Sequence, residues 1–284
     1  MDVTPFYHST TNSWSYVLAD PDARVCALID PVLDFELSAG WVHTTFVDDM
    51  LASIEAAGLR ALWVLETHIH ADHISAADYV RRQTGAKVGI GAGVEQVSEL
   101  FRGVFNLGSA HPDVGSAFDQ LFMPGETLTL GSLTLTVLAT PGHTPACVAY
   151  QVDQAVFVGD TLFMPDYGTA RADFPGGDAA ELYRSIQRLL ALPDDTVLYL
   201  CHDYPSENRS TPTAASTVKA QRQNVQLQDR DLAAFTAFRK ARDAKLDTPK
   251  LLYPSIQLNL AAGQMPAPEV ADQRFLKLPI RVRP

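Results

Sequence analysis

Residues 67–73 read Thr-His-Ile-His-Ala-Asp-His, and this stretch decides more about the fold than any other part of the chain. It holds three of the eight histidines and directly follows an apolar run at 61–65. A strand that ends in imidazoles and a carboxylate gathers metal-binding groups at one edge of a sheet, and these ligand types suit zinc and iron. A polar loop that is rich in histidine by chance is the alternative. Histidine is scarce elsewhere in the chain, so we favour the metal site.

Three further segments share this design, in which an apolar strand delivers a polar side chain at its end. The run 133–139 leads to His143, the run 155–158 leads to Asp160, and the run 197–200 leads to His202. One such strand end would indicate little, because a histidine there is more often a hydrogen-bonded structural residue. Three of them beside the histidine cluster indicate one shared site. The remaining histidines, His8, His43 and His111, are interpreted as ordinary surface or turn residues.

The composition is that of a soluble globular protein without a nucleic-acid partner. The chain has 284 residues, of which 46% are apolar and 19% charged, and its net charge is −11. This balance argues against general binding to nucleic acid or to anionic membranes. No secretory signal is visible, and no apolar run approaches the roughly 20 residues that cross a bilayer. Three widely spaced cysteines give no disulfide framework. We therefore expect a cytoplasmic protein.

Grouped strands with helices between them characterise the chain. Strands are expected at 14–18, 25–29, 61–66, 86–91, 127–130, 133–139, 146–152, 155–159 and 196–201, with two-residue turns at 131–132 and 153–154. Helices are expected at 42–58, 75–83, 93–102, 178–191 and over most of 213–245, and 103–125 is expected to be a loop. This order predicts an α/β fold, a four-layer αββα sandwich. We expect one domain over 1–284, with 205–284 as a C-terminal helical and extended segment packed on it.

The ordered set of polar residues resembles that of the metallo-β-lactamase superfamily along nearly the whole chain. It comprises His68, His70, Asp72, His73, His143, Asp160 and His202. The superfamily has the αββα fold with its metal at one edge between the two sheets. This resemblance agrees with the layering expected from the strand and helix pattern.

Within the superfamily, the chain is most similar to the persulfide dioxygenase branch, in the bacterial form related to β-lactamase-hydrolase-like proteins. The stretches that carry the similarity are 65–73, 141–147, 159–177, 202–204 and 249–255. Members bind one Fe(II) and oxidise glutathione persulfide with O2 to sulfite and glutathione, a step of sulfide metabolism. The resemblance implies that iron is bound by His68, His143 and Asp160, the ligand set of non-haem Fe(II) oxygenases. His70, Asp72, His73 and His202 would lie beside it.

A dinuclear zinc hydrolase of the hydroxyacylglutathione hydrolase (glyoxalase II) type is the alternative. Two Zn(II) ions would be held by His68, His70, His143 and Asp160, and by Asp72, His73, Asp160 and His202. Such a site generates a hydroxide that attacks a thioester. The C-terminal part lacks the Arg/Lys cluster with Asn-Pro-Phe that is typical of that enzyme's glutathione pocket. The sequence itself does not count the metal ions.

Arg171 and Tyr204 are the candidate substrate contacts. Arg171 lies in the loop after Asp160, where a guanidinium could bind a carboxylate of glutathione, and its alternative role is an ion pair with Asp173 or Asp166. Tyr204 lies two residues after His202, and its alternative role is a packed aromatic side chain. The expected partners are glutathione persulfide or a similar small thiol compound and O2. Relatives also indicate a homodimer.

Overall fold

Two six-stranded sheets form the centre of the computed structural model, which describes residues 1–108, 111–206, 209–280 and 282. The first sheet has the strand order β1 (Asp2–His8), β2 (Ser13–Asp20), β3 (Val25–Ile29), β6 (Arg60–Glu66), β8 (Lys87–Gly91), β9 (Gln120–Phe122). The second has the order β10 (Thr127–Leu130), β11 (Leu133–Ala139), β12 (Val148–Val152), β13 (Ala155–Phe157), β14 (Val197–Tyr199), β15 (Ala215–Thr217). A small third sheet has the order β5 (Trp41–His43), β4 (Val32–Glu36), β7 (Ile74–Ser75).

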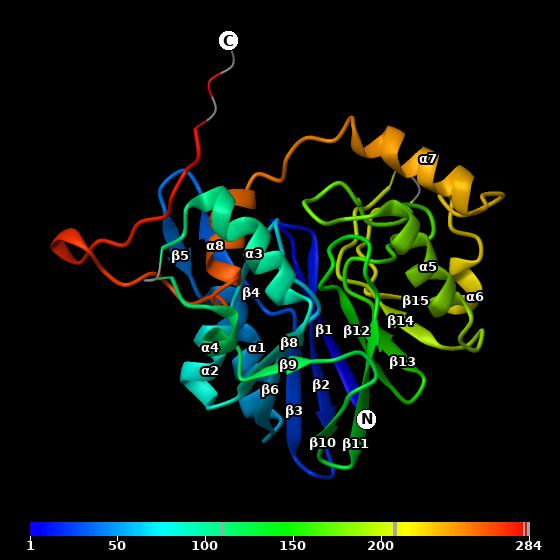
Figure 1. Ribbon diagram of the computed structural model, residues 1–284. Coiled ribbons are helices and arrows are strands. Elements are labelled where there is room, and N and C mark those ends of the chain that lie inside the picture. The colour runs from blue at the N-terminus through cyan, green and yellow to red at the C-terminus, as the bar shows by residue number, and fades with distance from the viewer. Residues whose placement is uncertain (109–110, 207–208, 281, 283–284) are drawn as a thin grey trace.

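Helices cover the outer faces of both large sheets (Figure 1). The first group contains α1 (Thr45–Ala56), α2 (Ala77–Thr84), α3 (Val94–Phe105) and α4 (Val114–Ala117). The second contains α5 (Ala179–Leu190), α6 (Val218–Gln221) and α7 (Leu232–Asp243). Three apolar clusters fill the three interfaces between layers: Met50 lies in the first, Phe157 between the sheets, and Leu182 in the third. The four-layer αββα sandwich expected from the sequence is confirmed.

Both expected two-residue hairpins are present in the second sheet. Leu130 pairs with Leu133 and Val152 pairs with Ala155, so Gly131-Ser132 and Asp153-Gln154 form the turns. Gly131 has φ +65° and Asp153 has φ +49°. Positive φ at the first turn residue matches the twist of the flanking strands, which explains why these residues occupy these positions.

The helix expected at 42–58 begins later, at Thr45, because the residues before it form strand β5. Trp41 and Val42 pair with β4 in an antiparallel register that places His43 opposite Asp34. Aromatic and β-branched residues favour such pairing. The Asp34 carboxylate also accepts a hydrogen bond from the backbone N–H of Phe46, 3.2 Å away, which stabilises the start of α1.

The expected loop at 103–125 contains the end of α3 as well as α4 and β9, while 109–110 lie outside the described residues. Asp113 caps α4 by accepting a hydrogen bond from the backbone N–H of Ser116. Strand β9 pairs in parallel with β8, and the Asp119 carboxylate accepts a hydrogen bond from the Val88 N–H at 2.8 Å. This pairing depends on distant residues, so the local pattern does not predict it.

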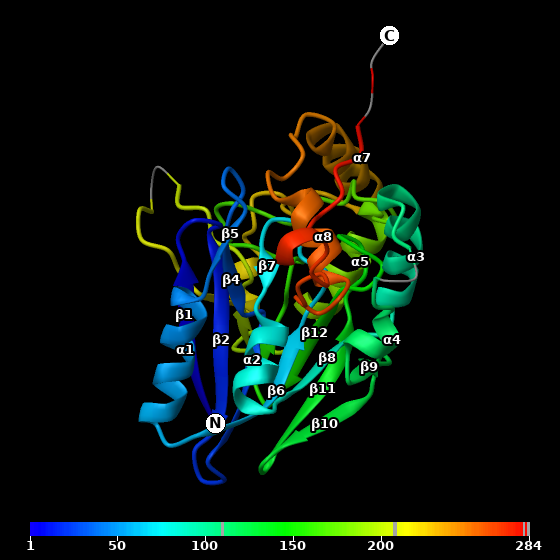
Figure 2. The same ribbon diagram turned by 90° about the vertical axis from the view of Figure 1, so that its left-hand side faces the viewer.

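The expected helix over most of 213–245 is present only in part, because a strand stands at its start and turns at 222–231 separate α6 from α7. Residues 215–217 form the edge strand β15 before α6 begins. Helix α8 (Leu252–Asn259) lies beside β7, as Figure 2 shows, and a short 3-10 helix follows at Val270–Asp272. Residues 207–208, 281 and 283–284 of the expected 205–284 segment lie outside the described residues.

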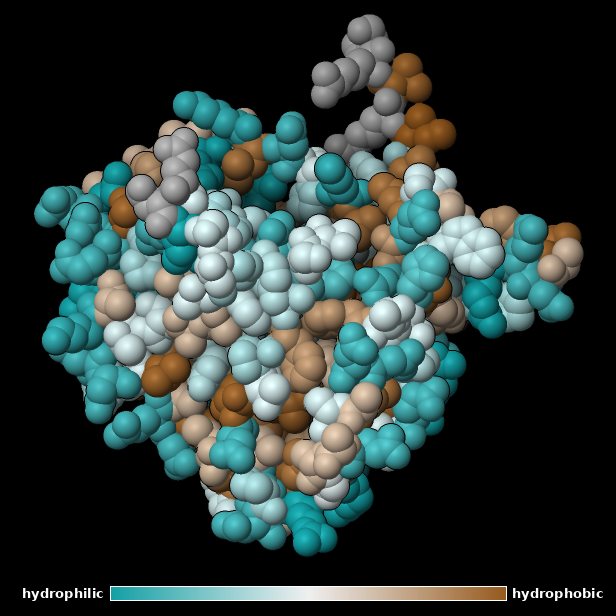
Figure 3. All heavy atoms as spheres, turned by 180° about the vertical axis from the view of Figure 1, so that it is seen from behind, coloured by the Kyte–Doolittle hydropathy of each residue, from teal (hydrophilic) through white to brown (hydrophobic). Residues whose placement is uncertain are grey.

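The last described residues leave the body with apolar side chains exposed, and such brown residues are visible at the top of Figure 3. Leu278 and Ile280 are exposed, whereas the backbone of Lys277 is held by two hydrogen bonds with the Gln257 side chain of α8. Among the described residues, none of the helices has the length and apolar character needed to cross a membrane. The homodimer, the single domain and the cytoplasmic location stay predictions.

Gly142 provides a test of how tightly the strand end before His143 is packed. It has φ +143°, and a Cβ atom there would lie 2.3 Å from the backbone N and Cα of Leu182. We expect Gly142→Ala to lower the free energy of unfolding by roughly 2–4 kcal/mol, because steric overlap adds to backbone strain. Denaturant unfolding of the purified variant measures this loss.

Gly85→Ala is the matched control, since Gly85 also has positive φ, +75°, but a Cβ atom added there would have nothing within 4 Å. This control should lose only the conformational contribution of about 1–2 kcal/mol. Equal losses in the two variants would contradict the steric explanation.

Candidate metal centre

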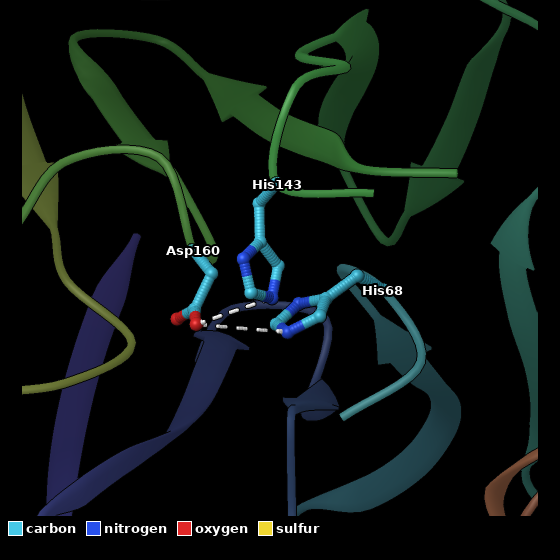
Figure 4. A group of neighbouring side chains, drawn as sticks. All are labelled: His68, His143 and Asp160. Carbon is cyan, nitrogen blue, oxygen red and sulfur yellow. Dashed lines mark ion pairs between the residues drawn. The ribbon is translucent and has the colours of Figure 1, made fainter. Parts of the chain in front are cut away.

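Three strand ends bring His68, His143 and Asp160 together, as Figure 4 shows. They follow β6, β11 and β13, so both large sheets contribute. The Oδ2 atom of Asp160 lies 3.6 Å from Nε2 of His143 and 3.9 Å from Nε2 of His68. One donor atom from each residue lies within 4.8 Å of the others, and all three residues are buried. The expected convergence is therefore present.

Hydrogen bonds on the far side of each imidazole leave a lone pair facing Asp160. Nδ1 of His143 donates to the carbonyl oxygen of Arg171 at 2.8 Å. Nδ1 of His68 lies 3.0 Å from the Thr67 hydroxyl, which itself donates to Asp30 at 2.8 Å, so the histidine is the donor. In a neutral imidazole the other nitrogen then has a free lone pair. Both Nε2 atoms are thus prepared to bind a cation.

Four buried polar atoms at this point have no hydrogen-bond partner among the described residues. They are Nε2 of His68, Nδ1 of His70, Nε2 of His73 and Oδ1 of Asp160. Buried polar atoms in proteins nearly always have a hydrogen-bond partner. A cation bound among these atoms would take the place of the missing hydrogen-bond donors. Burial lowers the pKa of His68 well below its usual value and that of His73 to about 4, so both rings keep a free lone pair. The donor set therefore fits a metal ion.

His70 lies between two buried carboxylates. Its Nε2 is 3.1 Å from both Oδ1 of Asp30 and Oε2 of Glu66. Burial opposes the charged form of His70, but Asp30 and Glu66 outweigh it and raise the pKa well above its usual value. Since carboxylates only accept, Nε2 carries a proton, and the raised pKa means that Nδ1 is protonated too in the metal-free protein. A metal ion at Nδ1 would have to displace that proton. Sequence reasoning missed both acids, although Asp30 follows the strand 25–29 in the same way that Asp160 follows β13.

A second set of donors lies beside the first. Oδ2 of Asp72 is 3.3 Å from Nδ1 of His73 and 3.4 Å from Nε2 of His202. Nε2 of His202 is also 3.4 Å from Oδ1 of Asp160. All seven residues that the sequence singled out thus occupy one region. Within it, their donor atoms form separate compact groups: His68 with His143 and Asp160, His70 with Asp72 and His73, and Asp160 with Cys201 and His202.

Asn259 of α8 holds the histidine loop from outside the donor set. Its amide NH2 donates to the carbonyl oxygens of His70 and His73 at 2.8 Å each, and its Oδ1 accepts from the Ser75 N–H at 2.8 Å. This residue lies almost 190 positions away in the chain (|i−j| = 189 and 186). No local pattern in the sequence could have found it.

The remaining histidines and the cysteines near the site differ in burial. His43 is exposed as expected, and His111 bonds to the carbonyl oxygens of Pro112 and Gln257 in a loop. The interpretation of His8 as an ordinary surface or turn residue is wrong, because it is 6% exposed and bonds through both ring nitrogens. Cys147 and Cys201 are buried as expected, and burial raises the pKa of both thiols.

A cleft of about 590 Å³ opens onto the centre, and both candidate substrate contacts line it. The Arg171 guanidinium pairs with both carboxylate oxygens of Asp173 and donates a third hydrogen bond to the Asp247 carbonyl. Two of its five N–H groups remain for a ligand. Tyr204 stacks on His202 and Tyr167, with ring centroids 5.6 and 4.7 Å apart. Both residues therefore line the cleft and also make the structural contacts that were the alternative to substrate binding, an ion pair for Arg171 and aromatic packing for Tyr204.

Comparison with known families agrees with this geometry. Residues 9–202 match the model of the metallo-beta-lactamase superfamily. The chain belongs to this superfamily. Its buried histidine and aspartate cluster, taken with this membership, makes it a metal-dependent enzyme.

Several of the similar proteins are named as hydrolases or as a glyoxylase. A probable metallo-hydrolase of Burkholderia pseudomallei is 46% identical over 99% of both chains, and glyoxylase B2 of Dictyostelium discoideum is 42% identical over 99% of this chain and 96% of its own. The beta-lactamase hydrolase-like protein of Xylella fastidiosa is 45% identical over 98% of this chain, which spans 64% of that protein.

Persulfide dioxygenases are similar at lower identity. The human mitochondrial persulfide dioxygenase ETHE1 is 32% identical over 70% of this chain and 67% of its own. The crystal structure of ETHE1 from Myxococcus xanthus superposes with a TM-score of 0.75 at 28% identity, covering 93% of this chain and all of that one (100%). These comparisons leave hydrolase and dioxygenase unresolved.

Replacing His143 tests the metal site directly. We expect His143→Ala to bind its metal ion at least about tenfold more weakly, because the substitution removes one metal ligand and exposes the other ligands to water. Metal analysis of the purified variant by mass spectrometry measures this loss. His43→Ala, which removes an exposed imidazole, should keep the full metal content. A metal content that His143→Ala leaves unchanged would show that the ligand assignment is wrong.

Asp30→Asn tests the buried network beneath the centre. The carboxylate accepts from the N–H and hydroxyl of Thr67 and from Nε2 of His70. Removing its charge should lower the free energy of unfolding of the metal-free protein by about 3 kcal/mol. The exposed Asp22→Asn should change it by less than about 0.5 kcal/mol.

The loss of unfolding free energy in Asp30→Asn should depend on pH, because both Asp30 and His70 titrate. Burial opposes ionisation of Asp30, yet His70 and the hydrogen bonds from Thr67 lower its pKa, so its contribution is lost as the pH falls through that lowered value. His70 has a raised pKa, so its contribution is present below about 6.5 and is lost as the pH rises through the folded-state value. The difference between wild type and Asp30→Asn should therefore be largest between about pH 4 and 6.5. A difference that does not vary with pH would contradict the ion pair.

Proposed function

We propose that this protein is a persulfide dioxygenase that binds one Fe(II) per chain and oxidises glutathione persulfide, or a similar small persulfide, with O2. The observation that carries the proposal is the compact group of His68, His143 and Asp160, whose free lone pairs face one point. Two imidazoles and one carboxylate that leave other positions open are the ligand set of non-haem Fe(II) oxygenases. The likeness to the Myxococcus xanthus ETHE1 structure over nearly the whole chain supports it.

A dinuclear zinc hydrolase is the second candidate, and a specific observation favours it. Asp72, His73 and His202 are all present beside the first group, and Nε2 of His73 has no hydrogen-bond partner among the described residues. This is the donor set that a second metal ion would need. The relatives at 42–46% identity that are named metallo-hydrolase or glyoxylase also favour hydrolysis over oxidation.

In the proposed reaction, bound iron would supply the redox chemistry for oxidising sulfur. The chain's own residues orient the substrate. The two free N–H groups of Arg171 would donate to a carboxylate of glutathione, and the pairing with Asp173 fixes the guanidinium before the substrate binds. Phe174 packs on both Arg171 and His143. Its ring centroid lies 5.0 Å from the guanidinium carbon of Arg171 and 5.1 Å from the ring centroid of His143. Phe174 lines the cleft and gives this wall an apolar surface.

Metal analysis and O2 uptake together decide between the two candidates. We expect protein reconstituted anaerobically with Fe(II) to hold about one iron per chain. It should consume one O2 and form one sulfite for each glutathione persulfide. Protein that retains about two zinc ions per chain, cleaves a glutathione thioester and takes up no O2 would establish the hydrolase instead. His143→Ala should be inactive in both assays, which controls for contaminating enzymes.

A further inference from the structure

A second recess, which we call the α8 groove, lies between the β4–β5 hairpin, α8 and the C-terminal segment (Figure 1). Its volume is about 530 Å³, within the range of pockets that bind small molecules. Most of its lining is apolar, with Leu37 and Val42 from the hairpin, Pro254 and Leu258 from α8, and Leu276 and Leu278 from the C-terminal segment. An apolar chain bound here would be removed from water.

Hydrogen bonds hold the walls of the α8 groove together. The side-chain amide of Gln257 donates to the carbonyl oxygen of Lys277 and accepts from its N–H, at 2.9 Å each, which fixes the C-terminal segment against α8. The Arg274 guanidinium donates to the carbonyl oxygen of Pro266 and ties the same segment to the residues that follow α8. Leu258, one of the lining residues, is 2% exposed. The groove is therefore a formed part of the fold.

Positive charge gathers at the α8 groove, although the chain as a whole has a net charge of −11. Lys250, Arg274 and Lys277 line it, and none of the described residues that line it is acidic. Arg274 and Lys277 donate hydrogen bonds to carbonyl oxygens, which are neutral and leave both positive charges uncompensated. A ligand that complements the groove therefore combines an apolar chain with a negatively charged end.

We propose that the α8 groove binds a free carboxylate with an unbranched apolar chain, such as a medium-chain fatty acid. The chain would pack on the apolar walls, and the carboxylate would pair with the lysine and arginine side chains at the groove. Burial of the chain supplies most of the affinity, and the charge selects which end group is accepted. The inference does not depend on which reaction the metal centre performs.

The α8 groove shares a wall with the cleft of the metal centre. Phe35, Leu37 and Lys250 line both spaces, and none of the three is a proposed metal ligand. A ligand in the groove would therefore contact side chains that also face the cleft. Val42 and Leu278, in contrast, line the groove and not the cleft, so their substitution separates the two sites.

Calorimetric titration of the metal-loaded protein with hexanoate, octanoate and decanoate tests the choice of ligand. Each added methylene should tighten binding roughly three- to fourfold, because it adds apolar surface that is buried on binding. Decyltrimethylammonium has the same chain length and a positively charged end, and it should bind at least about tenfold more weakly than decanoate. An affinity that does not change from hexanoate to decanoate, or equal binding of the two charged ends, would overturn the proposal.

Substitutions in the α8 groove test its location. Val42→Asp and Leu278→Asp each place a negative charge on its lining, and decanoate should bind both variants at least about tenfold more weakly. Leu278 is 65% exposed, so its substitution leaves the apolar core intact. Val225→Asp is the matched control, because Val225 is 49% exposed and lines neither space. Lys250→Gln should weaken binding of decanoate roughly three- to fivefold. Equal affinity in the two groove variants and the control would contradict this location.

Three further results would also overturn the proposal. Loss of decanoate binding in His143→Ala would mean that the carboxylate binds the metal ion instead. A dimer in sedimentation velocity that Val42→Asp dissociates, without binding of decanoate, would make the groove an interface between copies of this chain. Binding to vesicles of anionic phospholipid, without binding of free decanoate, would make it a membrane contact. None of these measurements uses persulfide oxidation or thioester hydrolysis, so failure of the proposed function leaves them unaffected.

Discussion

The structure depends on a group of imidazoles and carboxylates that are removed from water in one place. Their burial is unfavourable unless each lone pair and each charge finds a partner. Hydrogen bonds to Thr67, Asp30 and the Arg171 carbonyl satisfy the outward-facing atoms of His68, His70 and His143. The inward-facing atoms are left to a cation. The loops at the strand ends therefore present a set of ligands that fits a cation.

The parts of the chain that hold this group in place extend well beyond the residues around it. Arg239 of α7 is almost completely buried, pairs with Asp243, and donates to the carbonyl oxygen of Thr169. Asp243 accepts from the N–H of Ala172, next to the carbonyl that orients His143. Helix α7 thus supports one ligand loop, as Asn259 of α8 supports the other. The C-terminal segment contributes none of the three proposed iron ligands but restrains the loops that carry two of them.

The sequence predicted the layered fold and the convergence of the polar strand ends because both follow from local patterns. Apolar runs set the strands, and a polar residue directly after a run marks the edge of a sheet. Asp30 has the same signal and was missed because it lies alone in the sequence. Asn259 and Arg239 give no local signal, since Asn259 binds the histidine loop and Arg239 binds the Thr169 carbonyl, both far away in the chain. Strands β9 and β15 were missed for the same reason, because each is stabilised by a neighbouring strand rather than by its own residues.

The centre lies at the seam between two halves, each with its own apolar cluster under its outer helices. Loops at such a seam can change length or composition while the packing of either half is preserved. Part of the site can therefore change without disturbing either apolar cluster. New activities among proteins with this architecture then require changes in the loops between the two halves rather than in the apolar clusters.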